Sequence, residues 1–436
     1  MTQSVLYEFE RLLIYKMEIK KIKNARGEMT VPGDKSISHR AVMLGAIARG
    51  ETRISGFLPG ADCLSTIECF RQMGMDIEAD GENVTVKGRG LHGLSAPRKT
   101  LYTGNSGTTT RLLCGLLSGQ SFNSEITGDA SICRRPMRRV TEPLSQMGAK
   151  ISGEYCPLKI TGSRLHGIEY DMPVASAQVK TSLLLAGLYA EGGTIIREKE
   201  KSRDHTELML KAMGADIDVS GLDVCLKPVP ALTAQEVIVP GDISSAAFFM
   251  VLGAIMPDSC ITIRNVGINE TRTGIIDVLK SMGAKIKLEN VRVSAGESAA
   301  DITVSSSHLT GTQICGALIP RLIDELPVIA AAALFAGGET VIKDAQELKV
   351  KETDRIHAVV TEFKKCGADI SETDDGMIIR GGRTLHGADF KTYGDHRMAM
   401  SLAVLAQLAG GASSLDDAKC VEISYPDFFD DLYRLG

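Results

Sequence analysis

Hydrophobic and polar positions along the chain follow a pattern that recurs roughly every seventy residues. In each recurrence, an apolar helical stretch ends in a turn of the type Met-Gly-Ala, and an alternating, strand-like stretch follows. The glycines of these turns are Gly74, Gly148, Gly214, Gly283 and Gly367. Glycine is the usual left-handed residue at the end of a helix. The pattern predicts about six units, each with two helices and several strands.

A second repetition divides the chain into two parts. Residues 31–36 read VPGDKS, and residues 239–244 read VPGDIS. Each copy ends a strand-like run and opens an apolar helical stretch. The first copy carries Lys35 and, further on, Arg40, whereas the second has apolar residues at both places. We therefore expect the first copy to hold an anion and the second to serve as scaffold.

Together the two repetitions predict an α/β or α+β fold of two similar domains with three units each. The duplicated segments are expected where the chain passes between the domains, since Pro and Gly suit a stiff crossover. A cleft between the domains is the expected place for the active site.

Composition narrows the class of protein. A net charge of −5 argues against a nucleic-acid surface. The ten cysteines form no C-x-x-C pair and have no zinc-ligand spacing, so we expect reduced, mostly buried thiols, no metal and a cytoplasmic location. The N-terminus lacks the features of a signal peptide, and no apolar run is long enough to span a membrane.

Two glycine-rich stretches imitate nucleotide-binding motifs. Residues 88–93 match G-x-G-x-x-G, but Leu-Ser-Ala-Pro follows them instead of a helix. In residues 33–36, Asp34 separates the Gly from the Lys of a possible P-loop. Neither stretch predicts a nucleotide site.

Several helix starts carry more polar groups than capping needs. Residues 104–111, GNSGTTTR, free backbone N–H groups and add hydroxyls, which favours an anion cradle over a capped core helix. Arg134 and Arg135 precede a proline and suit a carboxylate or phosphate, although a solvated basic turn is an equal alternative. Residues 175–180 and 202–207, taken alone, are also compatible with ordinary caps.

Acidic residues are interleaved with these cations. Asp324 and Glu325 precede a long apolar run, either as partners of a helix dipole or as a base at a cleft wall. Residues 350–355, VKETDR, are either an exposed salt-bridged turn or part of a site. The candidate site set is Lys35, Arg40, Arg135, Lys351, Arg355 and Arg397 with the acids Asp324 and Glu352. Such a set suits small, multiply anionic substrates and proton transfer, without an activated Ser or Cys nucleophile.

With these segments in view, the chain resembles the family of 5-enolpyruvylshikimate-3-phosphate synthases. The segments GDKSISHR, GNSGTTTR, RRPM, ASAQVK, SRDHTE, PGDISSAAFF, KETDR and DHRMAM occur in the family's order, from about Met17 to the C-terminus. The resemblance implies transfer of the enolpyruvyl group of phosphoenolpyruvate to the 5-hydroxyl of shikimate 3-phosphate, with release of phosphate. This reaction belongs to chorismate and aromatic amino-acid biosynthesis.

The resemblance also implies an architecture. It predicts two domains, each of three inside-out βαβαββ units, with residues 34–240 in one and residues 17–33 plus 241–436 in the other. Residues 1–16 would be an extension. It further implies a monomer without cofactor, whose partners are the two small-molecule substrates and neither nucleic acid nor membrane.

Residue roles follow from the matched motifs. The resemblance implies that shikimate 3-phosphate contacts Lys35, Ser36, Arg40, Ser176, Ala177, Gln178, Arg203, Asp324 and Lys351. It implies that phosphoenolpyruvate contacts Lys35, Asn105, Gly107, Arg135, Gln178, Glu352, Arg355, His396 and Arg397. Asp324 would take the proton of the 5-hydroxyl, and Glu352, with Lys35 nearby, would protonate and later deprotonate the methylene carbon. The reaction would pass through a tetrahedral intermediate without a covalent enzyme adduct.

Two positions depart from some family members, which carry Asn where this chain has Glu347 and Lys where it has Ile423. In the family, glyphosate occupies the phosphoenolpyruvate site and a methyl group at Gly107 crowds it, so Gly107 predicts sensitivity. One alternative is the sister enzyme that acts on UDP-N-acetylglucosamine, whose mobile Cys loop this chain lacks. Another is an RNA-end-processing or phosphate-binding protein, which the acidic balance disfavours.

Overall fold

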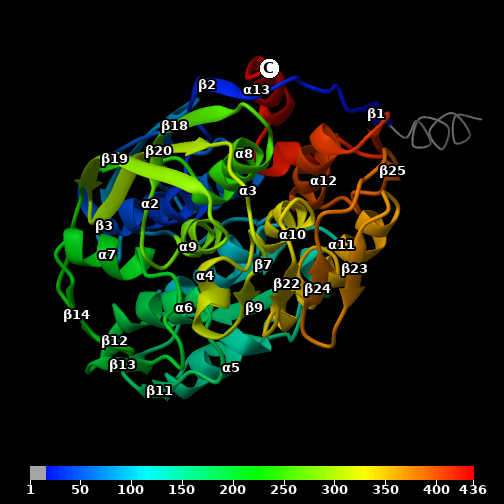
Figure 1. Cartoon of the computed structure of the whole chain (residues 1–436). Coiled ribbons are helices and arrows are strands. Elements are labelled where there is room, and N and C mark those ends of the chain that lie inside the picture. Colours follow the sequence, from blue (N-terminus) through cyan, green and yellow to red (C-terminus); the bar gives the residue numbers. More distant parts are fainter. Residues whose placement is uncertain (1–15) are drawn as a thin grey trace, which may run out of the picture.

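A computed structural model of the chain describes residues 16–436 (Figure 1). The predicted extension, residues 1–16, lies outside the described residues except for Lys16. Within the described part, six successive groups of helices and strands follow one another, as the sequence pattern predicts. The mixed α/β class is therefore confirmed.

Three units lie in the first half of the chain. The first contains α2 (Lys35–Ile47), β3 (Ala48–Ser55), α3 (Ala61–Gln72), β4 (Asp76–Asp80) and β5 (Asn83–Arg89). The second contains β6 (Leu101–Tyr102), α4 (Gly107–Ser118), β7 (Ser124–Thr127), α5 (Arg138–Gln146), β8 (Lys150–Ser152) and β9 (Leu158–Thr161). The third contains β11 (Glu169–Asp171), α6 (Ala177–Gly187), β13 (Thr194–Arg197), α7 (His205–Ala212), β14 (Asp216–Ser220) and β15 (Asp223–Lys227). The short strands β10 (Leu165–His166), β12 (Ala190–Glu191) and β16 (Leu232–Thr233) join neighbouring units.

Three further units lie in the second half. The fourth contains α8 (Ile243–Ile255), β18 (Cys260–Gly267), α9 (Gly274–Ser281), β19 (Lys285–Ser294) and β20 (Glu297–Ser305). The fifth contains β21 (Gln313–Ile314), α10 (Leu326–Leu334), β22 (Glu339–Ile342), α11 (Arg355–Lys364), β23 (Asp369–Glu372) and β24 (Met377–Arg380). The sixth contains β25 (Asp389–Phe390), α12 (His396–Leu408), β26 (Ser414–Leu415) and the C-terminal α13 (Phe428–Arg434).

The sheets repeat one topology. In the second, third and fifth units, the first strand is parallel to the next, and the last two strands form an antiparallel hairpin beside them. These three units have the βαβαββ order. The sixth is shortened: β25 and β26 pair in parallel, and β1 (Met17–Glu18) is antiparallel to β26.

The first and fourth units take their first strand from elsewhere in the chain. Strand β17 (Glu236–Ile238) is parallel to β3 in the first unit. Strand β2 (Arg26–Met29) is parallel to β18 in the fourth unit, and the two lie side by side in Figure 1. Thus the strand before α2 completes the second half, and the strand before α8 completes the first half.

The duplicated segments run between the halves and contact each other. Gly33 and Gly241 form an antiparallel bridge. The N–H of Asp34 donates to the carbonyl of Pro240 at 2.8 Å, and the N–H of Asp242 donates to the carbonyl of Pro32 at 2.8 Å. A Cβ on Gly33 would overlap the carbonyl oxygen of Gly56, so only glycine fits there.

Buried hydrophobic residues form two cores. One takes residues between Ile37 and Val239, and the other takes residues 19–31 together with residues between Ile243 and Leu435. Helices α2, α4 and α6 are almost wholly buried in the first core, and α8, α10 and α12 in the second. Beyond their polar first turns these helices are largely apolar around their circumference, which is why they lie inside while the sheets cover them.

The predicted helix-ending turns are present. Gly74, Gly148, Gly214, Gly283 and Gly367 have φ between +84° and +94°. The cysteines form no disulfide, but Cys260 and Cys315 are exposed, so the expectation of buried thiols was wrong for these two. Both lie beside strand ends at the surface. Within residues 16–436, every helix is too short or too polar to cross a membrane.

Candidate active site

Several of the predicted site residues lie at the first turns of helices. Lys35, Gly107 and Ala177 are the first residues of α2, α4 and α6, while Arg355 begins α11 and His396 begins α12. Side chains cap these helices: Asp34, Ser106, Ser176, Asp354 and Asp395 each accept a hydrogen bond from a first-turn N–H. Helix N-termini carry partial positive charge, so this arrangement favours anions.

Asp324 lies at the centre of the cationic set. Its carboxylate accepts from Arg203 Nη2 at 2.5 Å, from Lys351 Nζ at 3.2 Å and from Arg355 Nη1 at 3.3 Å. Its backbone carbonyl accepts from Arg397 Nη1 at 3.2 Å. Burial alone would raise the pKa of Asp324, but these four cations hold that pKa well below its usual value. Asp324 is therefore ionised at neutral pH.

Arg355 is buried and pairs with three carboxylates. Besides Asp324, it donates to Glu352 Oε2 at 2.7 Å and to Asp395 at 2.8 and 3.2 Å. Burial opposes ionisation of Glu352, but Arg355, His396 and Lys351 hold the pKa of Glu352 well below its usual value. Glu352 lies in the loop before α11, and Arg355 is the first residue of that helix. The ion pair therefore joins the loop to the start of the helix.

His396 is buried at the start of α12. Burial, and then the charge of Arg397, lower the pKa of His396 to about 3, so its ring is neutral at pH 7. Lys35 and Glu352 both act electrostatically on this ring, with opposite signs. The proximity of Lys35 to Glu352 stays a prediction.

In the first half, Arg40 is held by hydroxyls. It donates to Thr206 Oγ1 at 2.7 Å, to Thr181 Oγ1 at 2.9 Å and to the carbonyl of Ser36 at 3.0 Å. Lys35 contacts Asp62, an acid that sequence reasoning missed. Thr181 and Thr206 also went unrecognised, although each belongs to a helix that begins beside a predicted site residue.

The start of α4 gathers the remaining candidates. Asn105 Oδ1 accepts from Arg135 Nη2 at 3.0 Å. Gln178 accepts from Arg111 Nη1 at 2.9 Å and donates to Thr108 Oγ1 at 3.2 Å. Arg111 stands at the end of the GNSGTTTR motif and was not among the predicted contacts.

The two departures from the family pattern have clear surroundings. Glu347 pairs with Arg139 Nη1 at 2.9 Å, which joins the second half to the first. Ile423 packs against the second core. Both side chains therefore have structural contacts.

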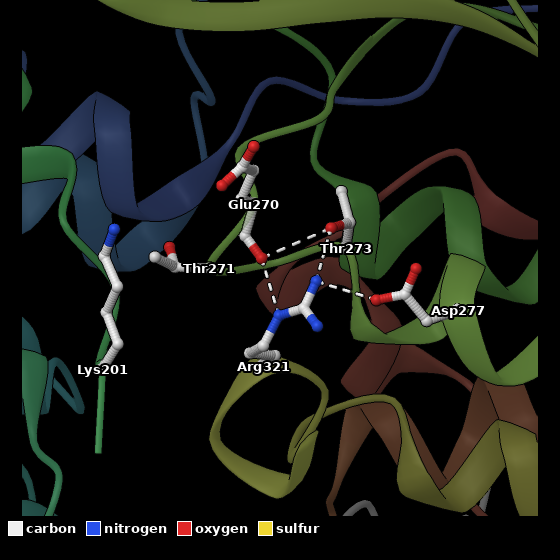
Figure 2. Close-up of a pocket in the computed structure, with 6 residues that line it drawn as sticks. All are labelled: Lys201, Glu270, Thr271, Thr273, Asp277 and Arg321. Atoms are coloured by element: carbon white, nitrogen blue, oxygen red, sulfur yellow. Dashed lines mark hydrogen bonds and ion pairs between the residues drawn. The ribbon is translucent and has the colours of Figure 1, made fainter. Parts of the chain in front are cut away.

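The structure also contains a cavity of about 420 Å³ (Figure 2). Its lining residues are Lys201, Glu270, Thr271, Thr273, Asp277 and Arg321. In Figure 2, Arg321 donates to the carbonyl of Glu270 at 2.7 Å and to Thr273 Oγ1 at 2.9 Å, and pairs with Asp277 at 2.8 Å. None of the predicted site residues lines this cavity. Within residues 16–436, no group of three His, Cys, Asp or Glu side chains is arranged to hold a metal ion.

Comparison with known proteins agrees with this geometry. The family model described as EPSP synthase (3-phosphoshikimate 1-carboxyvinyltransferase) matches residues 19–432. A 3-phosphoshikimate 1-carboxyvinyltransferase of Bacillus cereus is 57% identical over 414 residues, 94% of this chain and 96% of that protein. The enzyme of the same name from Thermoanaerobacter sp. (strain X514) is 56% identical over 416 residues, 95% of this chain and 98% of that protein.

A solved structure agrees with the fold. EPSP synthase from Acinetobacter baumannii superposes with a TM-score of 0.89 at 45% identity, covering 97% of this chain and 98% of that chain. The predicted fold of two similar domains of inside-out units and the predicted transferase class are thereby confirmed, and the UDP-N-acetylglucosamine enzyme is not favoured. The chain belongs to the EPSP synthase (3-phosphoshikimate 1-carboxyvinyltransferase) family.

Proposed function

We propose that the family's reaction takes place around Asp324. The enolpyruvyl group of phosphoenolpyruvate is transferred to the 5-hydroxyl of shikimate 3-phosphate, and phosphate leaves. The observation that supports this site is a carboxylate surrounded by cations from both halves of the molecule. A base among cations is what the reaction of two polyanions requires.

Two groups of residues bind the substrates in this proposal. Shikimate 3-phosphate lies against the starts of α2 and α6, where Ser36, Arg40, Ser176, Ala177, Gln178, Arg203 and Lys351 surround it. Phosphoenolpyruvate lies against the starts of α4, α11 and α12, where Asn105, Gly107, Arg135, Arg355, His396 and Arg397 surround it. Lys35 and Gln178 serve both substrates. Arginine forks match the planar carboxylate and phosphate groups.

Asp324 acts as the base in the first step. It removes the proton of the 5-hydroxyl while the oxygen bonds to C2 of phosphoenolpyruvate. Its low pKa keeps it ionised, so the proton acceptor is present without a preceding titration. The pairing with Arg203 and Lys351 holds the carboxylate in position.

Glu352 moves the proton at the methylene carbon. In the substrate-free site Arg355 keeps Glu352 ionised. Bound phosphoenolpyruvate brings phosphate and carboxylate charges to Arg355 and Arg397, which weakens that stabilisation and raises the pKa of Glu352. Glu352 then carries the proton that converts the methylene to a methyl group. In the elimination step it takes a proton back as the bond from C2 to the phosphate oxygen breaks.

The wider organisation is part of the proposal. We infer domains of residues 34–240 and of residues 17–33 plus 241–436, a division that the two separate hydrophobic cores support. We also infer a monomer that acts in the cytoplasm on small molecules alone. Light scattering of the purified chain at micromolar concentration tests the monomeric state, since a dimer would have twice the mass of 46.7 kDa.

Phosphate release from the purified protein tests the reaction. Release should need phosphoenolpyruvate and shikimate 3-phosphate together and should fall by about 10³-fold or more in Asp324→Asn. Asp76→Asn, at an exposed strand position, is the matched control and should retain full activity. Release from phosphoenolpyruvate alone would instead indicate a phosphatase, and release only with UDP-N-acetylglucosamine would indicate the sister activity.

A further inference from the structure

The two crossover segments share one buried guanidinium. Arg272 lies in the loop between β18 and α9 and is only 2% exposed. Its Nη1 donates to Asp34 Oδ2 at 2.8 Å, and its Nη2 donates to Asp242 Oδ1 at 2.9 Å. The same Nη2 lies 2.8 Å from Ser244 Oγ. Arg272 therefore binds equivalent aspartates from both copies of the repeated segment.

Asp242 connects Arg272 to Lys35. The backbone N–H of Lys35 donates to Asp242 Oδ2 at 3.3 Å, while Asp242 Oδ1 faces Arg272. Asp34, the residue before Lys35, caps α2 through Oδ1 and faces Arg272 through Oδ2. Two carboxylates that Arg272 orients, those of Asp34 and Asp242, therefore bind the backbone at the start of α2, where Lys35 is the first residue.

Ser244 and Glu325 connect Arg272 to the backbone beside Asp324. Ser244 Oγ donates to Glu325 Oε1, and Glu325 is the residue directly after Asp324. The same Oε1 lies 3.8 Å from Arg397 Nη1, and Arg397 Nη1 donates to the carbonyl of Asp324. Ser244 therefore connects the guanidinium of Arg272 to the backbone that carries the base.

The chemistry of this cluster requires an arginine. Asp34, Asp242 and Glu325 are three buried carboxylates around one guanidinium, and desolvated carboxylates need cationic partners. Bridging two carboxylates and a hydroxyl at once uses the planar fork of arginine, which the point charge of lysine lacks.

We propose that Arg272 is a positioning residue that sets Lys35 in the first half and Asp324 in the second in the relation that the reaction needs. This inference rests on the function proposed above. Arg272 acts through Asp242 on Lys35 and through Ser244 and Glu325 on Asp324. Unlike Lys35, the proposed substrate-binding residues Arg40 and Arg135 are held by other partners, Thr206 and Asn105.

Steady-state kinetics of Arg272→Lys provides the first test. The variant keeps the charge but loses the fork, so kcat should fall by about tenfold or more, and neither KM should rise by as large a factor. Arg264→Lys is the matched control, since Arg264 also bridges two carboxylates, those of Glu28 and Asp301, away from the site. It should leave kcat within about twofold of the wild type. A kcat within twofold for Arg272→Lys, or an equal loss in Arg264→Lys, overturns the proposal.

A double-mutant cycle with Ser244→Ala provides the second test. Ser244→Ala removes only the hydrogen bond to Glu325 and the contact with Arg272, and it should lower kcat by about threefold. Ser245→Ala, at the neighbouring buried serine, should leave kcat unchanged. Because both changes act on one path, the double variant should lose no more than Arg272→Lys alone. Losses that multiply would contradict the shared path. If Arg272→Lys does not fold, equal kcat values for the two serine variants are sufficient to reject the proposal.

These outcomes are separable from failure of the proposed function. If the wild type does not form product from the two substrates, the proposed function fails. If the wild type is active and the cycle is additive, only the role of Arg272 fails.

Discussion

Arg203 and Asp324 join the two halves of the molecule across the candidate site, with Nη2 of the arginine 2.5 Å from Oδ2 of the aspartate. The proposed base and one of the proposed substrate-binding cations are therefore partners in the substrate-free site. Each half alone holds only one member of the pair. The relation has kinetic consequences that can be measured.

Removal of the Arg203 charge should change both binding and pH dependence. In Arg203→Gln we expect KM for shikimate 3-phosphate to rise by about tenfold or more, because a cation facing the substrate is lost. Arg203 also lowers the pKa of Asp324, so its loss raises that pKa. The acidic limb of the pH profile of kcat/KM should then move to higher pH. An acidic limb at the wild-type position would contradict the pairing, and Arg197→Gln, at an exposed ion pair, is the control.

A methyl group at Gly107 should weaken phosphoenolpyruvate binding. Its Cβ would lie 2.7 Å from Nη1 of Arg111 and 3.5 Å from Nη1 of Arg135, so the Arg111 guanidinium, which donates to Gln178, has to shift. In Gly107→Ala we expect KM for phosphoenolpyruvate to rise several-fold and inhibition by glyphosate to weaken. Gly337→Ala, where an added Cβ makes only an ordinary contact, should leave both unchanged. Wild-type inhibition that does not depend on phosphoenolpyruvate concentration would show that the predicted site is wrong.

Loss of Lys180 should destabilise the first half. Its ammonium is 1% exposed and lies 2.8 Å from Glu198 and 2.6 Å from Glu207, both buried. Lys180→Met leaves two buried carboxylates without their cation, so the free energy of unfolding should fall by about 3–5 kcal/mol in urea titration. Lys87→Met offers a matched comparison, since Lys87 also bridges two carboxylates, but at the surface. Comparable losses in both variants would show that burial does not decide the effect.

Buried histidines should make stability fall in mild acid. Burial lowers the pKa of His39 from 6.5 to about 3, and the side chain bonds Thr66 Oγ1 at 2.7 Å. As the pH falls from about 6.5 to about 3, His39 binds a proton in the unfolded chain but stays neutral in the native protein, so acid favours unfolding. In His39→Gln the urea midpoint should fall less steeply over this range, whereas His308→Gln, at an exposed position, should follow the wild type. An unchanged slope in His39→Gln would refute this explanation.

The parts of the fold that depend on local chemistry could be predicted from the sequence. Met-Gly-Ala turns and apolar helical stretches are visible because each is specified by adjacent residues. The pairing of β2 with β18 leaves no local signal, since β2 has four residues and its partner lies more than two hundred positions away; only the family resemblance assigned residues 17–33 to the second half. The shortened sixth unit was missed for the same reason.

The candidate site shows the same division. Lys35, Glu352 and Arg355 stand in conspicuous charged motifs. Asp62 contacts Lys35 but stands in a helix without a conspicuous motif, and Arg111 closes the GNSGTTTR motif, which does not reveal its contact with Gln178. Only the packing of separate units brings such side chains together, and no local pattern records it.

The pairing of β2 with β18 also determines when the sheet of the fourth unit can form during synthesis. Strand β2 leaves the ribosome early, but its partner β18 follows more than two hundred residues later. At translation rates of about 5–20 residues per second, β2 waits roughly 10–50 s for its partner. During this delay its backbone hydrogen-bonding groups lack their final partner, a state that favours aggregation. The strand is short and carries Arg26 and Glu28. Charge in so short a strand disfavours pairing with other nascent chains, so the waiting segment is protected by its own composition.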